Sequence, residues 1–362
     1  MFISFLSRSI CASLALFLIL PLISPKISLA DEIPQTKRVV QASYGEVQII
    51  IPSDSGSEEE RKEALDLAEL TIVVHDGLLS PFLEGSDIYR LNNAKAGEKI
   101  KVNVLTILAV QIAISYSEDS MGLFEPTIGP VRKLYQFDSD TFANWPTPDE
   151  IQNALAKVGV QNLVIDEDNN EISFTKDGCS LDLQAFAKAY AIDQAIRSFV
   201  MRGFTNAIIS AGSTSSILGI DPRKKPDDSW TALFTDPWGN EKPGEITNKS
   251  QAWASSETAL VSIERDGIIY SNVLDPRNGK PVEKKIQVVL VRRPYFATEA
   301  SVLAQTFYVL GLQGTEDFLR KHAQDYFADG LTAIMIEKGE GDSTLNTTFE
   351  LGADGELTVT RK

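Results

Sequence analysis

Apolar residues recur along this chain with two different periods, which predicts a mixture of helices and strands. A period near 3.6 residues predicts helices at 60–75, 86–93, 107–116, 146–158, 182–203, 299–311 and 316–322. Alternation of apolar and polar residues predicts strands at 39–51, 164–174, 207–220, 230–234, 252–262, 268–281, 288–291, 331–336 and 349–358. The segments 164–174 and 207–220 each contain a turn and are expected to fold as hairpins. The pattern indicates an α+β fold, with helices flanking mixed sheets in two interlocked lobes.

Two stretches interrupt this pattern. Tyr44 and Gly45 lie in the middle of the strand predicted at 39–51, where a glycine indicates a bulge or a close approach of the backbone to another group. Residues 121–137, MGLFEPTIGPVRKLYQF, combine glycine, proline and aromatic residues, which predicts a loop without regular structure. Long ordered loops of this kind often carry functional residues.

Residues 181–193, LDLQAFAKAYAID, are the stretch around which the chain is organised. Asp182 follows a strand-like segment and precedes a helical apolar face that ends at Gly203, so it is expected to be the N-cap of this helix. The free N–H groups at such a junction suit an anion. Lys188 lies off the apolar face. Taken alone, the stretch is better explained as a capped amphipathic helix with a solvated lysine, and only the other motifs of the chain favour a binding site.

Residues 1–30 differ from the rest of the chain. Arg8 precedes an apolar run at 12–23, and Ser-Leu-Ala at 28–30 is a small-residue cleavage site before Asp31. We interpret 1–30 as a signal peptide and 31–362 as one domain in the periplasm or outside the cell, without a membrane span after cleavage. A retained N-terminal anchor is the alternative.

Composition restricts the ligands of the mature protein. The 362 residues carry a formal charge of −16, which becomes −18 without Arg8 and Lys26 of the leader. An acidic excess of this size argues against nucleic acid or an anionic membrane as partner. Cys11 lies in the leader and leaves Cys179 as the mature chain's cysteine, which excludes an internal disulfide.

Several ordered stretches resemble the ApbE-type family of FAD:protein FMN transferases, from about residue 44 to residue 311. Residues 182–191, DLQAFAKAYA, resemble the family's Asp-Leu-Gly-Gly-Ile-Ala-Lys-Gly-Tyr-Ala. Phe124-Glu125-Pro126-Thr127 resembles its Phe-Asp-Pro-Thr, with Glu125 in place of the aspartate. SDI followed by LN at 86–92 and DPRNG at 275–279 are similar to two further family motifs.

The resemblance implies transfer of FMN from FAD to a threonine or serine hydroxyl of a partner protein, with release of AMP and assistance by Mg²⁺. FAD is then a substrate, and the macromolecular partner is an acceptor protein. The positions implied to contact the flavin nucleotide are Tyr44, Phe82, Leu123, Phe124, Glu125 and Val273, with Asp182 and Lys188 at its ribose and phosphates. The implied catalytic positions are Asn272 and Asp275, and the implied metal positions are Ala185, Ser301 and Gln305.

The chain departs from the family pattern where the chemistry is expected. Ser301 and Gln305 stand where the family has an aspartate and a threonine, although Mg²⁺ favours carboxylate oxygen. Glu299 and Thr306 lie nearby as alternative donors. Asn272 stands where the family has a histidine, and an amide cannot act as a general base. These changes predict a homologue with weakened or altered activity.

Three hypotheses about function follow. The first is an exported flavin transferase. The second is a catalytically silent flavin-binding or partner-binding protein on the same scaffold. The third is an exported solute-binding domain unrelated to flavin. His75 and His322 lie outside every motif, and we interpret both as surface or packing residues.

Overall fold

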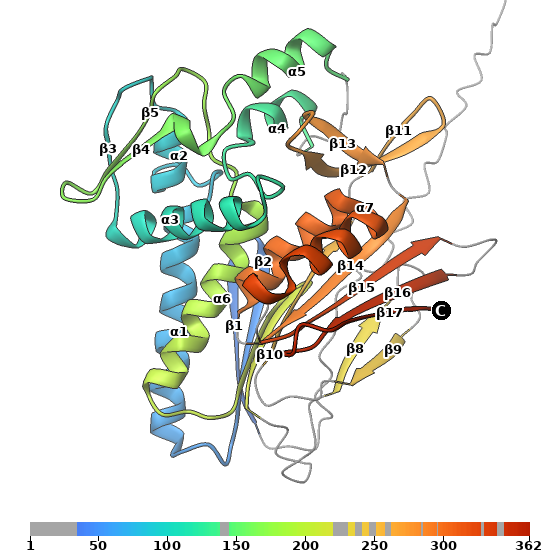
Figure 1. The fold of residues 1–362 in the computed structure, drawn as a ribbon. Helices are drawn as coiled ribbons and strands as arrows, with labels where there is room; N and C mark the ends of the chain where they lie inside the picture. Colours follow the sequence, from blue (N-terminus) through green and yellow to red (C-terminus); the bar gives the residue numbers. More distant parts are fainter. Residues whose placement is uncertain are drawn as a thin grey trace, which may run out of the picture.

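A nine-stranded antiparallel sheet underlies the molecule (Figure 1). The computed structural model describes residues 35–137, 145–219, 231–235, 241–245, 251–257, 262–283, 285–294, 296–326, 329–338 and 344–362. In spatial order, the strands are β1 (Gln35–Ala42), β2 (Gly45–Pro52), β6 (Ala207–Ala211), β7 (Thr214–Leu218), β10 (Gln251–Glu257), β14 (Ile286–Arg293), β15 (Leu331–Lys338), β16 (Thr344–Leu351) and β17 (Leu357–Arg361).

Three long helices cover one face of this sheet: α1 (Glu58–Leu79), α6 (Gln184–Met201) and α7 (Ala297–Tyr326). Ile192 and Phe199 of α6 pack against Ile49 and Ile209 of the sheet in one core cluster. A second cluster joins α7 to β14–β16. Full burial of side chains of this size contributes about 1.5–3 kcal/mol each, which holds the helix layer in place.

The remaining helices and two small sheets lie above the helix layer in Figure 1. They comprise α2 (Asp87–Asn92), α3 (Val104–Asp119), α4 (Gly129–Tyr135), α5 (Pro148–Leu155), the 3₁₀ turn Val160–Asn162, β3 (Ile100–Lys101), β4 (Leu163–Asp166), β5 (Glu171–Phe174), β11 (Ser262–Arg265), β12 (Ile268–Asp275) and β13 (Lys280–Glu283). A further hairpin consists of β8 (Thr231–Thr235) and β9 (Glu241–Glu245). The chain passes from β10 in the large sheet to β11–β13 and back to β14, so the two parts are interlocked.

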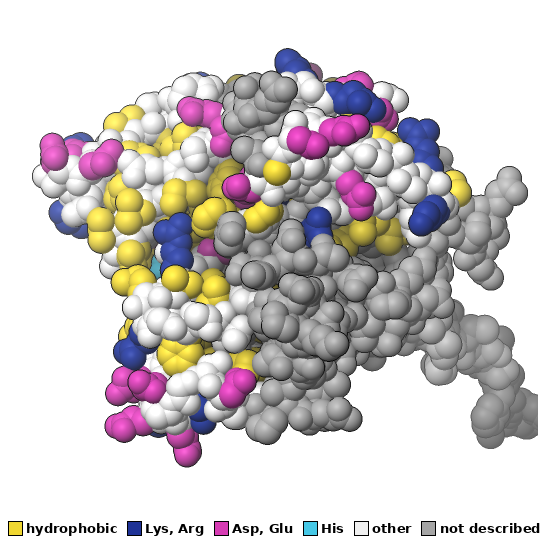
Figure 2. Space-filling view, turned by 60° about the horizontal axis from the view of Figure 1, so that its bottom comes forward, with side chains coloured by type: hydrophobic (Ala, Val, Ile, Leu, Met, Phe, Trp, Pro, Cys, Tyr) yellow, Lys and Arg dark blue, Asp and Glu magenta, His cyan; other side chains and the backbone are white. Residues whose placement is uncertain are grey.

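The α+β class is therefore confirmed, as are most of the predicted helices and the hairpins at 164–174 and 207–220. Ser86 caps α2 as expected, since its hydroxyl accepts a hydrogen bond from the Tyr89 N–H. Figure 2 shows acidic and basic side chains interspersed on the described surface of one face. Within the described ranges, no helix combines the length and apolar character needed to cross a membrane. The predicted leader at 1–30 lies outside those ranges.

Several predictions about elements are wrong. The strand predicted at 39–51 is the β1–β2 hairpin, and Gly45 follows its turn with a φ of 110°. Apolar alternation continues through the turn and so concealed it. The segment 349–358 is likewise the end of β16, a turn and the start of β17. By contrast, the two helices predicted at 299–311 and 316–322 are confirmed, because α7 consists of two helices on either side of a kink at Gly311, whose φ of 69° is non-helical.

The segment 121–137 contains a helix, α4, although its composition predicted a loop. Pro130 occupies the first turn of α4, where its fixed φ favours a helix and its missing N–H costs nothing. Asp182 is not the N-cap of α6, because the helix begins at Gln184 after Leu183. The Asp182 carboxylate instead accepts a hydrogen bond from the Gln184 N–H at 3.1 Å.

Candidate functional site

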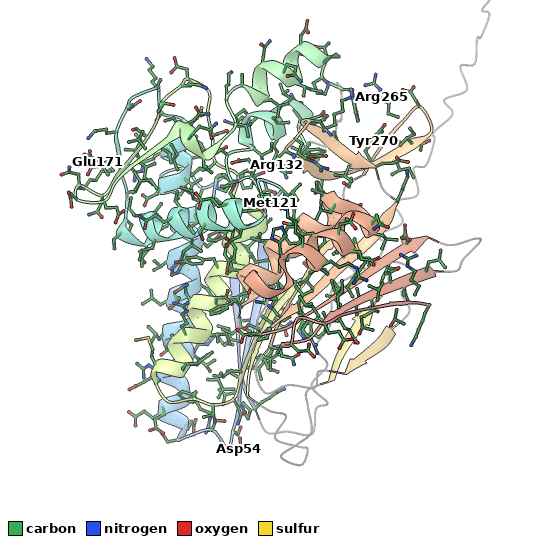
Figure 3. The ribbon with its side chains drawn as sticks, in the orientation of Figure 1. Asp54, Met121, Arg132, Glu171, Arg265 and Tyr270 are labelled. Atoms are coloured by element: carbon green, nitrogen blue, oxygen red, sulfur yellow. The ribbon has the colours of Figure 1, made fainter. Side chains whose placement is uncertain are left out.

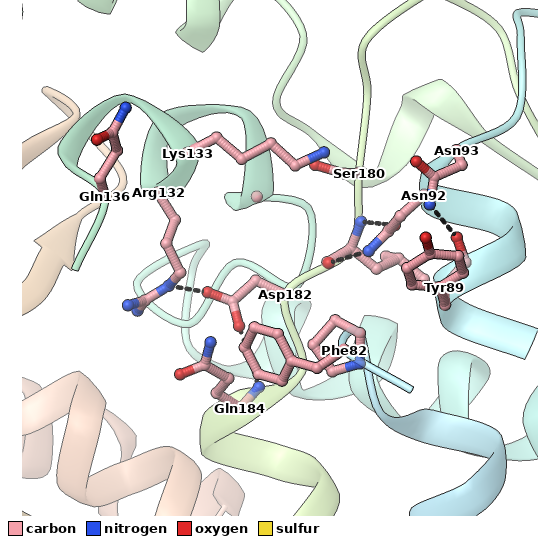
Figure 4. A pocket seen from close by; sticks show the side chains of 13 residues that line it. Phe82, Tyr89, Asn92, Asn93, Arg132, Lys133, Gln136, Ser180, Asp182 and Gln184 are labelled. Atoms are coloured by element: carbon pink, nitrogen blue, oxygen red, sulfur yellow. Dashed lines mark hydrogen bonds and ion pairs between the residues drawn. The ribbon is translucent and has the colours of Figure 1, made fainter. Parts of the chain in front are cut away.

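Two neighbouring cavities share a wall made by Arg132, Asp182 and Gln184. We call the first, of about 500 Å³, the Phe82 cavity; it is lined by Pro81, Phe82, Tyr89, Asn92, Asn93, Gly129, Arg132, Lys133, Gln136, Ser180, Leu181, Asp182 and Gln184 (Figure 4). We call the second, of about 370 Å³, the Lys188 cavity; it is lined by Phe124, Glu125, Ile128, Arg132, Asp182, Gln184, Ala185, Lys188, Ser213, Thr214, Ser255, Asn272, Val273, Ser301 and Gln305.

Asp182 is positioned by two other motifs of the chain. The Asn92 amide donates to the Leu181 carbonyl at 2.9 Å and accepts from the Leu181 N–H at 2.7 Å. The Asp182 N–H donates to the Pro126 carbonyl at 2.7 Å. Each such bond contributes about 0.5–1.5 kcal/mol net. The motif residues at 86–92 and 124–127 therefore hold the segment that carries Asp182.

Gly129 lets α4 approach this segment. A Cβ at Gly129 would lie 2.4 Å from the Ser180 hydroxyl and 2.7 Å from the Ser180 carbonyl. A larger residue would therefore force α4 away from Asp182. The Ser180 hydroxyl, in the wall of the Phe82 cavity, is buried without a hydrogen-bond partner in the described structure.

Arg132 of α4 forms an ion pair with Asp182 through its Nε atom (Figure 4). The Arg132 side chain is 17% exposed and that of Asp182 is 7% exposed. The guanidinium carbon also lies 5.4 Å from the centre of the Phe137 ring, a cation–π geometry. Figure 3 places Arg132 where the small upper elements meet the helix layer.

Sequence reasoning did not select Arg132. Its segment was predicted to be a loop, and its partner Asp182 lies 50 residues away along the chain. The available signal was the adjacent basic pair Arg132-Lys133 within an aromatic, proline-containing segment of an acidic chain.

The Lys188 cavity gathers most of the predicted site residues: Phe124, Glu125, Asp182, Ala185, Lys188, Asn272, Val273, Ser301 and Gln305. Phe82 lies in the neighbouring cavity and is 58% exposed. The Lys188 amine lies 3.5 Å from the Ser213 hydroxyl between β6 and β7. Lys188 is thus part of a cavity wall rather than of a solvated helix face.

Three predicted residues line neither cavity. Tyr44 packs against the core cluster of α1, α6 and β2, and burial raises the pKa of its hydroxyl. Leu123 lies in the core cluster of α7 and β14–β16. The Asp275 carboxylate accepts from the Arg277 backbone and guanidinium at 2.8–2.9 Å and from the Asn278 amide at 3.1 Å. It is therefore occupied in building its own turn.

Glu125 has one carboxylate oxygen occupied within its own loop. Its Oε1 accepts from the Thr127 N–H at 2.9 Å and from the Thr127 hydroxyl at 2.7 Å. Burial raises the pKa of Glu125, and the two bonds from Thr127 oppose this increase. Of the two carboxylates in the Lys188 cavity, Asp182 is paired with a cation, whereas Glu125 is held by neutral donors.

Comparison with known proteins identifies the family. Residues 46–328 match the model described as the ApbE family. The chain belongs to the ApbE family. The FAD:protein FMN transferase of Salmonella typhimurium is 29% identical to it over 276 residues, which cover 74% of this chain and 75% of that protein. The FAD:protein FMN transferase of Treponema pallidum is 25% identical over 256 residues, 67% of this chain and 70% of that protein.

Solved ApbE structures share the fold. The apo form of the flavinyl transferase ApbE of Pseudomonas stutzeri superposes with a TM-score of 0.72 and 21% identity, covering 87% of this chain and 95% of that chain. The ApbE protein of Thermotoga maritima gives a TM-score of 0.70 and 24% identity, covering 86% and 96%. At these identities the likeness concerns the fold alone.

The donor set of this ApbE-family chain does not fit a resident Mg²⁺. Ala185, Ser301 and Gln305 lie in one cavity, but the Ser301 hydroxyl donates to the Ala185 carbonyl at 2.7 Å. The three positions supply a carbonyl, a hydroxyl and an amide, whereas Mg²⁺ in proteins is usually held by one or two carboxylates. In the described part of the chain, no group of three or more His, Cys, Asp or Glu residues is placed to hold a metal.

The two residues considered as alternative metal donors are engaged elsewhere. Glu299 forms an ion pair with Arg293 at 2.9 Å, and burial raises the pKa of Glu299. The Thr306 hydroxyl is fully buried and donates to the Val302 carbonyl at 2.8 Å within α7. Neither residue lines the Lys188 cavity.

Both histidines of this ApbE-family chain lie outside the two cavities. His75 is buried in α1, its Nδ1 donates to the Thr71 carbonyl at 2.7 Å, and its ring meets Tyr190 edge-on at 5.5 Å. The ring of His322 lies 4.9 Å from that of Phe318. These contacts agree with the expected packing role.

Proposed function

We propose that this chain is an exported FAD:protein FMN transferase, which moves FMN from FAD to a threonine or serine hydroxyl of a partner protein and releases AMP. The proposal is supported by family membership and by relatives that carry this name. The single observation that carries it is the pair of cavities meeting at Asp182. Each cavity lies in the size range of small-molecule sites, so together they suit the two halves of a dinucleotide.

The proposed reaction is a phosphoryl transfer. The acceptor hydroxyl oxygen forms a bond to the FMN phosphorus, and the bond from that phosphorus to the bridging oxygen breaks, so that AMP leaves with the bridging oxygen. The hydroxyl proton must pass to a base. Catalysis of this kind depends on positioning the phosphates and on neutralising their charge.

The residues of the Lys188 cavity have distinct roles in this proposal. Lys188 places a positive charge beside the phosphates of the bound nucleotide. Asn272 is an amide and positions groups by hydrogen bonding rather than by taking a proton. Glu125 accepts the proton of the acceptor hydroxyl, because it is the cavity carboxylate without a cationic partner in the described structure. No step is assigned to a protein-held metal ion.

The second candidate function is a flavin-binding or partner-binding protein without transfer activity. This second function is favoured by the amide at Asn272 and by the absence of a carboxylate at Ala185, Ser301 and Gln305. These departures from the family pattern lie at positions expected to perform the reaction, whereas the motifs that build the fold are retained. The two functions share the binding site and differ in whether the pyrophosphate of FAD is cleaved.

One experiment separates the two functions. Purified protein lacking residues 1–30 is incubated with FAD, with and without Mg²⁺ and with an acceptor protein containing a flavinylation threonine. AMP is quantified by chromatography, and the acceptor by intact mass. A transferase releases AMP and adds the mass of FMN to the acceptor. Binding of FAD without either product identifies the silent flavin-binding protein, and no binding of FAD contradicts both the transferase and the flavin-binding protein.

Export through a cleaved leader is part of the proposed function. The apolar run at 12–23 and the Ser-Leu-Ala at 28–30 support cleavage before Asp31. An acceptor protein would then be met in the same compartment.

A further inference from the structure

The Lys188 cavity must balance the charge of the nucleotide without a metal site of its own. At neutral pH the pyrophosphate of FAD carries two negative charges. The cavity contains the carboxylates of Glu125 and Asp182 and the cations of Arg132 and Lys188. A carboxylate-free donor set at Ala185, Ser301 and Gln305 leaves a resident Mg²⁺ without its usual anionic ligands.

We propose that Arg132, fixed by Asp182, binds the pyrophosphate of FAD in place of a protein-held divalent cation. The inference rests on the proposed function, since it assumes that FAD is the ligand of these cavities. It assigns a substrate-binding role to a residue outside the motifs at 86–92, 124–127, 182–191 and 275–279.

The geometry prepares the Arg132 guanidinium for an anion. A guanidinium has five N–H donors in a planar fork, and Asp182 occupies the one on Nε. Among the described residues, the four donors on the two terminal nitrogens have no hydrogen-bond partner, at a residue that contributes to the walls of both cavities. Contact with the Phe137 ring fixes the guanidinium further. A planar fork held in this way matches two phosphate oxygens with little loss of side-chain entropy.

The location suits the middle of a dinucleotide. Arg132 lies in the wall that the two cavities share, and a pyrophosphate lies between the two nucleoside halves of FAD. The exposed ring of Phe82 offers an aromatic surface to one half, in the Phe82 cavity. The unpartnered Ser180 hydroxyl lies in the wall of the same cavity.

Charge also makes Arg132 necessary. Without it, the cavity would contain Glu125 and Asp182 against Lys188 alone, an excess of one negative charge. Asp182 would then be an uncompensated, largely buried carboxylate beside a dianion. Like charges repel most strongly at short range and away from bulk water. Loss of Arg132 would therefore remove its attraction for the pyrophosphate and expose the pyrophosphate to repulsion by Asp182.

The test compares the affinities for FAD and for riboflavin, measured by flavin fluorescence, with EDTA or with Mg²⁺ present. The native protein is expected to bind FAD in EDTA and more tightly than riboflavin. Arg132→Gln is expected to weaken FAD binding about 10- to 100-fold, as the loss of charge-assisted hydrogen bonds does, with little effect on riboflavin. Arg132→Lys keeps the positive charge without the planar fork, and its affinity for FAD is expected to lie between those of the native protein and Arg132→Gln.

Two further variants control for folding and for charge. Arg320→Gln removes a guanidinium from an exposed pair with Glu316 on α7 and should bind FAD as the native protein does. Arg132→Gln combined with Asp182→Asn should recover part of the lost affinity, because the uncompensated carboxylate is also removed. Circular dichroism verifies that each variant is folded.

The outcomes distinguish this inference from the proposed function. If Arg132→Gln binds FAD as tightly as the native protein, or if the native protein binds FAD only with Mg²⁺, the role of Arg132 is overturned while FAD binding stands. If the native protein binds no FAD under either condition, the proposed function fails and the inference fails with it.

Discussion

At the scale of single residues, Asp182 connects the candidate site to the rest of the chain. Its backbone is hydrogen-bonded to Pro126, and the preceding residue, Leu181, is held by Asn92. Its carboxylate orients Arg132 and accepts from the N–H of Gln184 at the start of α6. The residues that resemble family motifs at 86–92 and 124–127 thus support the site through hydrogen bonds, although only some of them face a cavity.

A first prediction at this scale concerns Glu125 as the base. Its pKa is raised by burial, so the ionised form that accepts a proton is lost at a higher pH than for an exposed glutamate. The rate of AMP release should therefore fall as the pH is lowered through this raised pKa. Glu125→Gln should reduce the rate about 10²–10⁴-fold and remove this acidic limb.

The pH profile of AMP release for native protein and Glu125→Gln, at saturating FAD, measures this directly. Glu125→Asp, which retains a carboxylate, is the matched control and should preserve an acidic limb. An unchanged rate and an unchanged acidic limb in Glu125→Gln would exclude Glu125 as the base.

A second prediction at this scale concerns the missing metal ligands. Ser301→Asp with Gln305→Thr replaces the Ser301 hydroxyl, which now donates to the Ala185 carbonyl, by a carboxylate beside the same carbonyl. This variant should acquire FMN transfer that depends on Mg²⁺, and Asn272→His in the same background should increase the rate further. Both the Mg²⁺ dependence and the rate increase are measured from the rate of AMP release at a series of Mg²⁺ concentrations. Identical Mg²⁺ dependence in native protein and variant would show that these positions do not hold the metal.

At the scale of elements, α6 and α7 are joined by a buried cap. The Asp193 carboxylate of α6 accepts from the N–H groups of Ala297 and Thr298 at 2.8–2.9 Å, where α7 begins. Burial raises the pKa of Asp193 to about 6 despite these donors. Because α6 carries Lys188 and α7 carries Ser301, this cap also fixes two walls of the Lys188 cavity relative to each other.

The raised pKa of Asp193 predicts how stability depends on pH. The folded state binds the proton of Asp193 more tightly than the unfolded state does. The resulting contribution to the free energy of unfolding is complete below about pH 4 and is lost as the pH rises through about 6. Urea unfolding of native protein and Asp193→Asn at several pH values measures it. The free energy of unfolding of native protein relative to Asp193→Asn should fall by about 2–3 kcal/mol between pH 4 and pH 7. A constant difference, or one that rises with pH, would contradict this account.

The sequence predicted elements well where one pattern persists over many residues. The long helices α1, α3 and α6 and the β6–β7 hairpin follow this rule. Prediction from the pattern failed where a short feature lies inside a longer one, as with the seven-residue helix α4 and the turn between β1 and β2.

The candidate site could be predicted in part for the same reason. Motif residues identified most of the Lys188 cavity, because they are local in sequence. The pairing of Arg132 with Asp182 and the hold of Asn92 on Leu181 span 50 and 89 residues, and only the folded chain brings these partners together. The engagement of Asp275 in its own turn is likewise invisible in a motif.

At the scale of the whole molecule, the ApbE-family match at 46–328 leaves the N-terminal residues outside it. If 1–30 form a cleaved leader, the exported protein begins at Asp31 and is recovered without a membrane anchor. N-terminal sequencing or intact mass of protein expressed with its full sequence measures this. Recovery of a species that retains residues 1–30 in the membrane fraction would show that the N-terminus is an anchor instead.

In the proposed function, the two cavities around Asp182 bind FAD and present its pyrophosphate for cleavage. The most direct measurement is the amount of AMP released from FAD by the purified mature protein, with Asp182→Ala as the comparison. We predict AMP release by the native protein, and weaker FAD binding with loss of AMP release in Asp182→Ala, because Arg132 and the start of α6 lose their common anchor. FAD binding and AMP release equal in the two proteins would contradict the account.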